Sequence, residues 1–399
     1  MGQPAKVVIV TQHYPPDQST TAAIMVAIAG HLAQHAPVLV LSGSPGSAAT
    51  GSTVQPTVVE IRNRMPGKAA LIRRAAAEIL FTLRIFLALL TRLQRGDAVL
   101  MVTAPFMLPY AATAAARLKR AGSVLIMHDL YPDVLVMSGL LKPGSLAAKA
   151  MRGLNALMFR ALTAVVVIGR DTEKLLLQYG EMMRAKMHFI PNWATLAPGV
   201  RPLLADNPYR TSIQSRFVVG LSGNLGFTHD PVIVFEAARL LADRPDIHFL
   251  LSGWGIGFDR LKQMQSTANL PNVTFVDRVD DDNLERFLSA ANVWVIPYRR
   301  DLAGVSVPSR FYNLLAMGRP VILVSEAAAE AARIVREYDV GWVVTPGNGD
   351  ELAKTISVAA ASQDDMRAER AAGIAQRFNL PDAMGRYVQL VLGLLRGES

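Results

Sequence analysis

The feature that most constrains the fold is a regular alternation of short apolar runs with longer segments of helical periodicity. The runs hold three to five residues, are rich in Val and Ile, and recur along the whole chain. Continuous apolar runs of this length, separated by helices, are typical of parallel strands that are covered on both faces. We expect twelve strands, at residues 7–10, 38–41, 99–102, 124–127, 164–168, 188–190, 217–221, 248–251, 273–276, 293–296, 320–324 and 342–344.

The expected strands fall into two sets of six, which predicts two domains. A chain of 399 residues fits two domains of ordinary size and can bury ample core without disulfides. Neither the apolar runs of strands nor the periodicity of helices continues over residues 191–215, where Pro and Asn cluster. We therefore predict an α/β fold with two Rossmann-like, doubly wound parallel-sheet domains, at 1–195 and 210–378, facing across a cleft. The last helix, within 379–399, can cross back to the first domain.

Composition excludes several classes of protein and points to an anionic partner. The absence of Cys excludes disulfide frameworks, zinc–thiolate sites, iron–sulfur clusters and cysteine nucleophiles, and 51% hydrophobic residues exclude a disordered chain. Residues 1–199 carry 20 Lys or Arg and 9 Asp or Glu, whereas residues 200–399 carry 21 and 23. A positive excess in one half indicates that this half meets nucleic acid, a membrane surface or a pyrophosphate-bearing substrate.

Two basic, apolar stretches of the first half favour the membrane surface. Residues 68–95 have a single acid, Glu78, and residues 140–162 have none. A helix of this kind can lie on a bilayer while its Arg side chains reach the headgroups, although a core helix with a few solvated Arg remains an alternative. No nucleic-acid partner is expected, because no binding motif appears. The candidate membrane-contacting residues are Arg73, Arg74, Arg84 and Arg92.

A membrane-spanning helix is not expected. Residues 98–116 lack Asp, Glu, Lys and Arg over a length that could span a bilayer, but Pro105 and Pro109 interrupt them. The first ten residues do not have the pattern of a signal peptide.

Two glycine-rich turns follow predicted strands of the second half. In the turn 221–230, Gly223 and Gly226 precede a helix whose N-cap would be Thr228 or Asp230. Glycine lets the backbone approach an anion, and a helix N-terminus attracts one, although any tight turn between a strand and a helix also uses glycine. The second turn contains Gly253, Gly255 and Gly257, and its spacing is not that of a dinucleotide-binding fingerprint.

Two further segments place polar side chains after predicted strands. Pro308 would lie in the first turn of a helix that presents Ser309 and Arg310, and a cation beside helix N–H groups suits a pyrophosphate. In the first half, His128 and Asp129 follow a strand directly, at the edge where ligands bind in open parallel sheets.

Taken in order, these motifs resemble those of the GT-B-fold family 4 glycosyltransferases, the retaining, nucleotide-sugar-dependent class. Within the family, the chain is most similar to bacterial enzymes of capsule, exopolysaccharide and O-antigen biosynthesis. The resemblance runs from about residue 7 to residue 395. It is carried by residues 14–16 (Tyr-Pro-Pro), 128–132 (His-Asp-Leu-Tyr-Pro), 190–193 (Ile-Pro-Asn-Trp), 223–226 (Gly-Asn-Leu-Gly), 308–312 (Pro-Ser-Arg-Phe-Tyr) and 316–320 (Ala-Met-Gly-Arg-Pro).

The resemblance implies a transferase that uses a UDP- or GDP-linked sugar as donor and needs no metal or other cofactor. The second domain would bind the donor, with residues 276–279 near its base, and the first domain would take a lipid-linked saccharide acceptor. His128 would lie near the anomeric carbon, with Asp129 as a hydrogen-bonding partner, and attack would be assisted by the leaving phosphate. The expected donor-binding residues are Gly223, Asn224, Gly226, His229, Gly253, Gly255, Arg278, Val279, Ser309, Arg310 and Asn313.

The chain departs from the family pattern at several of these positions. Asn224 and His229 stand where many members have Arg and Lys, and Val305 and Asn313 stand where two Glu occur. Ser-Thr-Thr at 19–21 replaces a glycine pair. These changes keep open an alternative, a catalytically degenerate nucleotide-binding partner of another glycosyltransferase. A nucleotide-sugar 2-epimerase fits less well, since the carboxylates that it needs are missing.

A lipid-linked acceptor, carried on polyprenyl diphosphate, would explain the uneven charge. Anionic lipid attracts basic segments by about 1 kcal/mol for each Lys or Arg near the surface. We therefore expect a peripheral protein at the cytoplasmic face of the inner membrane.

Overall fold

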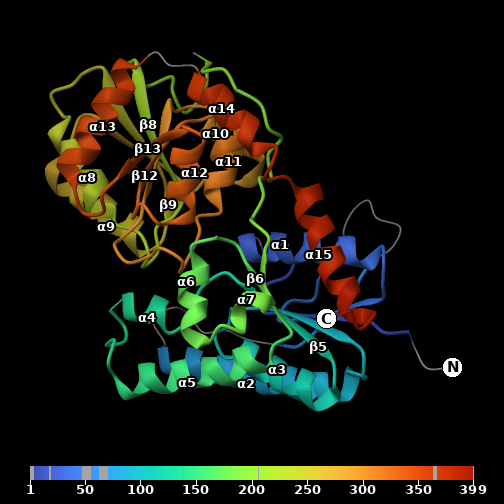
Figure 1. Cartoon of the computed structure of the whole chain (residues 1–399). Helices are drawn as coiled ribbons and strands as arrows, with labels where there is room; N and C mark the ends of the chain where they lie inside the picture. The colour runs from blue at the N-terminus through green and yellow to red at the C-terminus, as the bar shows by residue number, and fades with distance from the viewer. Residues whose placement is uncertain are drawn as a thin grey trace. The chain divides into compact units, whose positions relative to one another are not determined.

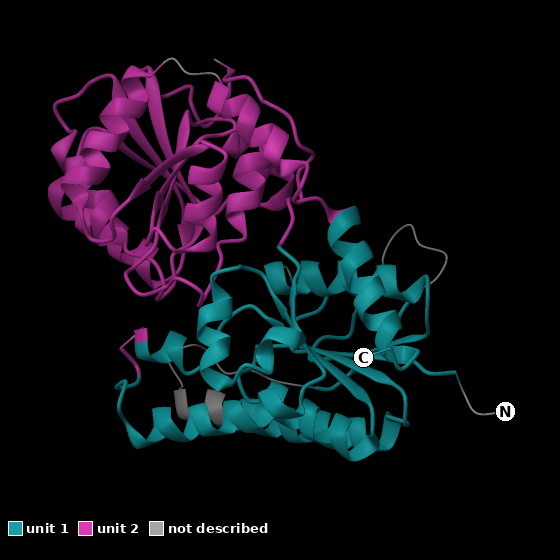
Figure 2. Ribbon diagram, viewed as in Figure 1, with its two compact units in different colours: residues 1–136, 141–191, 381–399 teal, residues 137–140, 192–380 magenta. Residues whose placement is uncertain are grey.

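The computed structural model describes residues 4–17, 19–46, 55–62, 71–137, 139–204, 206–362 and 366–398, apart from the side chains of residues 71, 72, 74 and 75. The chain forms two compact units (Figure 2). Unit 1 comprises Met1–Val136, Leu141–Pro191 and Pro381–Ser399, and unit 2 comprises Met137–Leu140 and Asn192–Leu380. Each unit is built on one parallel sheet with helices packed on it (Figure 1).

The sheet of unit 1 has seven strands in the order β3-β2-β1-β4-β5-β6-β7, and every neighbouring pair is parallel. Its strands are β1 (Val7–Thr11), β2 (Val38–Ser42), β3 (Thr57–Glu60), β4 (Ala98–Val102), β5 (Gly122–Met127), β6 (Ala164–Val167) and β7 (Met187–Phe189). The order reverses between β1 and β4, which we call the switch point of unit 1. Ligands of open parallel sheets bind beyond the carboxyl ends of the strands at such a point.

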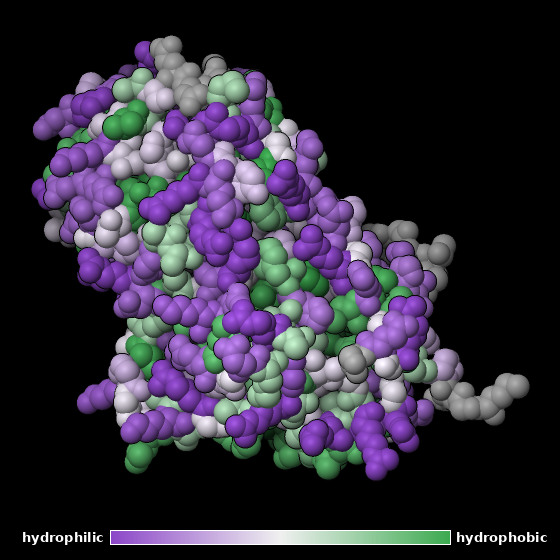
Figure 3. Space-filling model, in the orientation of Figure 1, coloured by the Kyte–Doolittle hydropathy of each residue, from purple (hydrophilic) through white to green (hydrophobic). Residues whose placement is uncertain are grey.

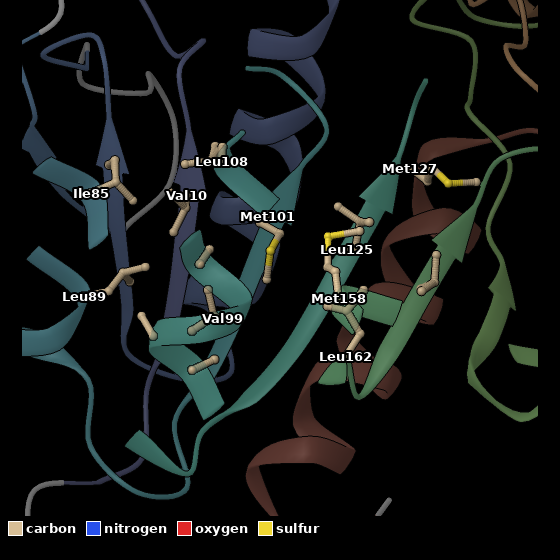
Figure 4. Close-up of a cluster of buried hydrophobic side chains, with 14 of the residues drawn as sticks. Val10, Ile85, Leu89, Val99, Met101, Leu108, Leu125, Met127, Met158 and Leu162 are labelled. Atoms are coloured by element: carbon tan, nitrogen blue, oxygen red, sulfur yellow. The ribbon is translucent and has the colours of Figure 1, made fainter. Parts of the chain in front are cut away.

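Helices α2, α3 and α5 cover one face of this sheet. Alternate residues of the strands, such as Val10 and Met101, point to this face, where they meet Ile85 of α2, Leu108 of α3 and Met158 of α5 (Figure 4). Helix α3 contacts both α2 and α5 and therefore lies between them. The helices assigned in this part of the chain are α1 (Thr20–Ala33), α2 (Leu71–Arg92), α3 (Leu108–Lys119), α4 (Asp133–Met137), α5 (Leu146–Ala161), α6 (Thr172–Leu176), the 3-10 turn η1 (Leu177–Tyr179) and α7 (Met183–Lys186).

The last helix, α15 (Leu380–Leu395), runs almost entirely within unit 1, on the opposite face of its sheet together with α1 (Figure 1). Its Tyr387 and Val391 are buried. Nη1 of Arg386 donates a hydrogen bond of 3.2 Å to the carbonyl oxygen of Phe189, the last residue of β7. The chain thus ends in the unit in which it begins.

The sheet of unit 2 has six strands, all parallel, in the order β10-β9-β8-β11-β12-β13, with its own switch point between β8 and β11. Its strands are β8 (Phe217–Asn224), β9 (Ile247–Trp254), β10 (Val273–Val276), β11 (Val293–Pro297), β12 (Val321–Val324) and β13 (Gly341–Val344). Its helices are α8 (Pro231–Leu240), α9 (Ile256–Ala268), α10 (Asp281–Leu288), α11 (Arg310–Ala316), α12 (Glu330–Glu337), α13 (Gly349–Ala361) and α14 (Met366–Ala375).

The predicted α/β class is confirmed, and all twelve expected strands are present. The strand that the prediction missed is β3, which lies at the edge of its sheet with no fully buried residue. Residues 98–116 contain β4 and most of α3 and are not one long helix. Among the helices that the structure describes, none combines the length and apolar character needed to cross a bilayer.

Candidate functional site

The loops that follow β8 and β11 meet at the switch point of unit 2. His229 and Tyr298 form an isolated antiparallel bridge between the two loops. The N–H of Arg299 donates a hydrogen bond of 3.0 Å to the carbonyl of Thr228, and the N–H of Asp230 donates one of 2.9 Å to Pro297. Asp230 then caps α8, since its carboxylate accepts the N–H of Val232 at 3.0 Å. The two loops therefore form one connected structure where a ligand is expected.

The glycines of the two predicted turns let the ends of β8 and β9 approach each other closely. A Cβ on Gly253 would overlap the carbonyl oxygen of Gly223, and a Cβ on Gly255 would lie 2.5 Å from Oδ1 of Asn224. The N–H of Gly257, in the first turn of α9, donates a hydrogen bond of 2.9 Å to the carbonyl of Leu225. Close packing between the loops thus explains why glycine is needed at positions 253 and 255. The N–H of Gly257, one of the amides at the start of α9 that could bind an anion, is already hydrogen-bonded within the protein.

Arg310, the first residue of α11, extends its guanidinium back to the end of β8. Its Nη2 donates a hydrogen bond of 2.5 Å to the carbonyl of Asn224, and its Nη1 donates to the carbonyl of Ser222. A Cβ on Gly223, whose φ is +97°, would lie 3.1 Å from the guanidinium carbon. Burial lowers the pKa of Arg310 to about 10, so the side chain stays charged at neutral pH. This places a fixed cation directly over the glycine of the turn.

His229 is buried in the same cluster and is neutral. Burial first, and then the positive charges of Arg310 and Arg299, hold the pKa of His229 well below its usual value. Its Nδ1 lies 3.1 Å from Oγ1 of Thr228, its ring packs against Tyr298, and its Nε2 has no hydrogen-bond partner among the described residues. The imidazole at this position is therefore neutral, and the positive charge of this cluster comes from the two arginines.

Arg278 and Val279 lie in the loop after β10, beside the same edge of the sheet. The guanidinium of Arg278 stacks over the indole ring of Trp254, 4.3 Å from its centroid. The loop is held by Oγ of Ser252, which donates a hydrogen bond of 2.8 Å to the carbonyl of Asp277. Sequence reasoning did not single out Trp254, although an exposed aromatic residue between two glycines is a readable signal.

Ser309 and Asn313 flank Arg310 on α11 and have different surroundings. Ser309 is the N-cap residue, and its side chain makes no capping hydrogen bond. The helix begins two residues after Pro308, not with Pro308 in its first turn as predicted, and Pro308 instead accepts the N–H of Phe311 at 3.1 Å. Oδ1 of Asn313 accepts a hydrogen bond of 2.7 Å from the backbone N–H of Thr195. The structure thus groups Gly223, Asn224, His229 and Arg310, whereas Asn313 is already hydrogen-bonded to another segment.

In unit 1, His128 and Asp129 follow β5 at its carboxyl end, as predicted. Burial lowers the pKa of His128 to about 4, so its ring is neutral at neutral pH, and its Nε2 has no hydrogen-bond partner within the described ranges. The N–H of Asp129 donates a hydrogen bond of 3.3 Å to Oγ1 of Thr103, which follows β4. The buried Asn155 of α5 supports this loop with a hydrogen bond of 2.6 Å to the carbonyl of Tyr131.

Two family models match the two halves of the chain. The description "Glycosyl transferase 4-like domain" matches residues 5–193, and "Glycosyl transferases group 1" matches residues 216–361. The chain belongs to the family 4 glycosyltransferases.

Relatives and solved structures agree with this membership. The probable glycosyltransferase WbjE of Pseudomonas aeruginosa is 26% identical over 356 residues, which is 88% of each chain. The putative colanic acid biosynthesis glycosyl transferase WcaI of Escherichia coli strain K12 is 26% identical over 229 residues, or 56% of each chain. The crystal structure of Anabaena Alr3699/HepE in complex with UDP and glucose superimposes with a TM-score of 0.71 at 16% identity, over 97% of this chain and 99% of the other. The fold of this glycosyltransferase is therefore GT-B.

The arginines expected at a membrane lie on α2. The side chains of Arg73, Arg84 and Arg92 are exposed, while that of Arg74 lies outside the described residues. Nη1 of Arg84 donates a hydrogen bond of 2.8 Å to the carbonyl of Arg62. These residues of the glycosyltransferase belong to unit 1, whereas Arg310 and the glycine turns belong to unit 2.

Proposed function

We propose that this glycosyltransferase moves a sugar from a UDP- or GDP-linked donor to a lipid-linked acceptor, with retention of configuration at the anomeric carbon. Its biological role would be in the assembly of a bacterial surface polysaccharide. The observation that carries the proposal is the position of Arg310 over Gly223 at the switch point of unit 2. The solved relative that contains UDP and glucose supports a nucleotide donor, and the relative named for colanic acid biosynthesis supports a polysaccharide product.

The chemistry of the transfer explains why a fixed cation matters there. Cleavage of the bond between the anomeric carbon and the donor phosphate leaves its electron pair, and hence additional negative charge, on the diphosphate. A cation held in place by the protein stabilises this developing charge without having to reorganise. Arg310 and Arg299 supply positive charge in this cluster, and we propose that no metal or other cofactor is required. Arg278 and Trp254 would lie on the side of the nucleotide base.

A thermal-shift panel of UDP, GDP and their sugars tests the donor site. We expect at least one nucleotide to raise the melting temperature of the protein, and we expect Arg310→Ala to lose this rise. Arg210→Ala is a matched control, because Arg210 is also a partly buried arginine of unit 2 that donates to backbone carbonyls, those of Ala290 and Arg216. A rise that survives in Arg310→Ala would contradict the assignment of the phosphate site.

We propose that unit 1 takes the acceptor while the enzyme lies on an anionic bilayer. The contact surface would be the outer side of α2, α3 and α5, which we call the α2–α3–α5 face. Large apolar side chains are exposed along all three helices, with Leu146 86%, Leu118 67% and Leu157 63% exposed. Figure 3 shows hydrophobic side chains along the lower edge of unit 1, where these helices lie in Figure 1. The other exposed apolar residues of this face are Ile79, Leu80, Leu83, Leu87 and Leu154.

The charge of the α2–α3–α5 face complements anionic lipid. The three helices carry nine Lys or Arg and one Glu. Basic residues beside exposed leucines are the composition of helices that lie in the interface of a membrane. This arrangement supports a peripheral enzyme at the cytoplasmic face of the inner membrane, where polyprenyl-diphosphate-linked acceptors are found.

Transfer itself is tested with radiolabelled nucleotide sugars and an acceptor extracted from membranes. We expect incorporation of label into the lipid fraction with one donor of the panel. One observation supports the alternative function, a catalytically degenerate nucleotide-binding partner of another glycosyltransferase. Val305, which is buried and apolar, occupies a position where family members have Glu. Nucleotide binding without incorporation across the whole panel would support that second function.

A further inference from the structure

The C-terminal ends of α2, α3 and α5 lie at one edge of the unit 1 sheet. Each helix precedes a strand, α2 before β4, α3 before β5 and α5 before β6, and these strands are parallel neighbours. Ala98 of β4 pairs with Gly122 of β5, so both strands begin at the same level. Ala164, the first residue of β6, pairs with Val124. The three helices therefore end side by side, at the edge opposite to the one that carries His128.

Four exposed arginines stand at these helix ends, and we call them the amino-edge cluster. They are Arg95 after α2, Arg117 in the last turn of α3, Arg120 at the C-cap of α3, and Arg160 in the last turn of α5. The N–H of Gly96 donates a hydrogen bond of 3.3 Å to the carbonyl of Arg120. Arg95 and Arg120 therefore lie in adjoining segments of the chain.

A lysine links the other two arginines of the cluster. Nζ of Lys186 donates hydrogen bonds of 3.1, 2.8 and 2.6 Å to three carbonyls at the C-terminus of α5, those of Phe159, Arg160 and Leu162. Burial, and then the positive charge of Arg117, lower the pKa of Lys186. The ammonium thus uses all three of its N–H groups within the protein, and its charge is fixed close to Arg117 and Arg160.

The amino-edge cluster is not neutralised by the residues that the structure describes. None of its four side chains has a hydrogen-bond or ion-pair partner among them. The acid nearest in sequence, Asp97, is 2% exposed and is already paired with Lys6, with 3.0 Å between Oδ2 and Nζ. By contrast, Arg152 of α5 is paired with Asp133 at 3.2 Å. Unpaired cations that are gathered in one place attract an anion from outside the protein.

Apolar side chains beside the cluster indicate the kind of anion. The largely exposed Leu118 follows Arg117 directly, and the equally exposed Leu157 lies three positions before Arg160, on the same side of α5. An exposed leucine next to an unpaired arginine suits the boundary between acyl chains and phosphate groups, whereas a soluble anion makes no contact that buries the leucine. The cluster also continues the α2–α3–α5 face beyond the ends of its helices.

We propose that the amino-edge cluster is a binding site for the phosphate groups of anionic phospholipids. The arginines would bind the phosphates, and Leu118 and Leu157 would lie among the first methylene groups of the acyl chains. This inference rests on the proposed contact between unit 1 and an anionic bilayer. It adds a headgroup site at one end of the α2–α3–α5 face to the arginines within α2.

Co-sedimentation of the full-length protein with vesicles of phosphatidylglycerol and phosphatidylcholine tests the site. The cluster variant replaces the four arginines of the cluster by Gln. The control variant makes the same change of charge on unit 2, at the exposed residues Arg239, Arg260, Arg336 and Lys354. We expect the cluster variant to lose about 10³-fold in affinity and the control variant to lose much less. Equal losses would overturn the assignment, because they would show that only the net charge matters.

The melting temperature shows whether the cluster variant is folded. It should match that of the unsubstituted protein, since the four side chains have no described partner. If it is lowered, the double variant Arg117→Gln with Arg160→Gln replaces the cluster variant, with an expected loss of about 30-fold in affinity. Undiminished binding of that double variant would also overturn the assignment.

A competition experiment separates a lipid site from a site for free phosphate. Sodium phosphate should release the protein from the vesicles no more than sodium chloride of the same ionic strength does. Stronger release by phosphate would overturn the assignment to lipid. If the unsubstituted protein does not bind anionic vesicles, the proposed membrane contact fails and the site fails with it. If it binds and the cluster variant binds equally well, only the site fails.

Discussion

The side-chain oxygen of Asn313 accepts a hydrogen bond of 2.7 Å from the backbone N–H of Thr195, 118 positions earlier in the chain. Nδ2 of Asn313 donates a second bond, of 3.0 Å, to Oγ1 of Thr195. Together with the bond of 2.8 Å from the N–H of Gly199 to the carbonyl of Ala316, these contacts tie α11 to the segment that opens unit 2. Because α11 begins with Arg310, the same contacts help to fix the cation over Gly223.

Replacing Asn313 by Ala should therefore affect stability more than nucleotide binding. We expect the free energy of unfolding to fall by about 1 kcal/mol, the net value of a hydrogen bond in a partly exposed site. Urea unfolding measures this loss, and Asn313→Asp, which keeps an acceptor for the N–H of Thr195, should lose less. A large loss of the nucleotide-induced thermal shift at unchanged stability would show instead that Asn313 contacts the donor.

Gly223→Ala should damage both the fold and the donor site. The residue has a φ of +97°, and a Cβ would press on the guanidinium of Arg310. We expect a loss of about 1–3 kcal/mol in the free energy of unfolding and a weaker thermal shift with nucleotide. Gly226→Ala is the control for stability, because the atom nearest to its Cβ, Nδ2 of Asn224, would be 3.7 Å away. Equal losses in the two variants would contradict the role of Gly223.

The stability of the protein should fall in mild acid, partly because of His128. An unfolded chain protonates a histidine near pH 6.5, whereas burial lowers the pKa of His128 to about 4 in the folded protein. Between these values the unfolded state binds a proton that the folded state excludes. The free energy of unfolding therefore decreases as the pH falls, by at most about 1.4 kcal/mol per pH unit from this group.

Urea unfolding of His128→Gln at pH 7, 6 and 5 measures this contribution. The variant should lose less stability between pH 7 and pH 5 than the unsubstituted protein, whatever its absolute stability. His31→Gln, on α1, provides the comparison for a histidine whose ring is bonded to its own helix. Parallel pH dependences for His128→Gln and the unsubstituted protein would rule out His128 as the source.

Membrane binding should depend on the arginines of α2. Four charges at about 1 kcal/mol each correspond to a loss of about 10³-fold in affinity for anionic vesicles. Co-sedimentation with vesicles of phosphatidylglycerol and phosphatidylcholine measures this affinity. The combined variant replaces Arg73, Arg74, Arg84 and Arg92 by Gln.

The apolar part of the same surface is tested separately. Leu83→Ser with Leu87→Ser should also weaken vesicle binding, including at high salt, because the apolar contribution is not screened. Leu240→Ser with Val358→Ser is the control, since both residues are exposed apolar residues of unit 2. Undiminished binding of the arginine and leucine variants would exclude the α2–α3–α5 face as the membrane contact.

The fold could be predicted because each strand of a covered parallel sheet is a continuous apolar run. The pattern failed at β3, where Thr57 and Glu60 are exposed and Val58 and Val59 are only partly buried. An edge strand has a neighbour on one side only, so its sequence need not be apolar throughout. Its pairing with β2 is set by tertiary contacts that the local pattern does not contain.

The candidate site was predictable in part for a related reason. Glycines and Pro308 mark turns locally, so the motifs indicated the cluster of Gly223, Asn224, His229 and Arg310, whose role in donor binding stays a prediction. The bond between Asn313 and Thr195 joins residues 118 positions apart, and no local pattern encodes it. The neutral state of His229 also depends on burial by the assembled loops.

The return of α15 to unit 1 affects how the protein is made. Residues 381–399 leave the ribosome after all of unit 2, yet Tyr387 and Val391 complete the packing of a sheet whose strands are all synthesised before residues 192–380. At roughly 5–20 residues per second, translation of the segment from Asn192 to Leu380 takes on the order of 10–40 s. During that interval the nascent unit 1 exposes the apolar surface that α15 later covers, whereas unit 2 can fold as soon as it emerges. A chaperone that holds the nascent chain would thus bind the first half of the protein for longest.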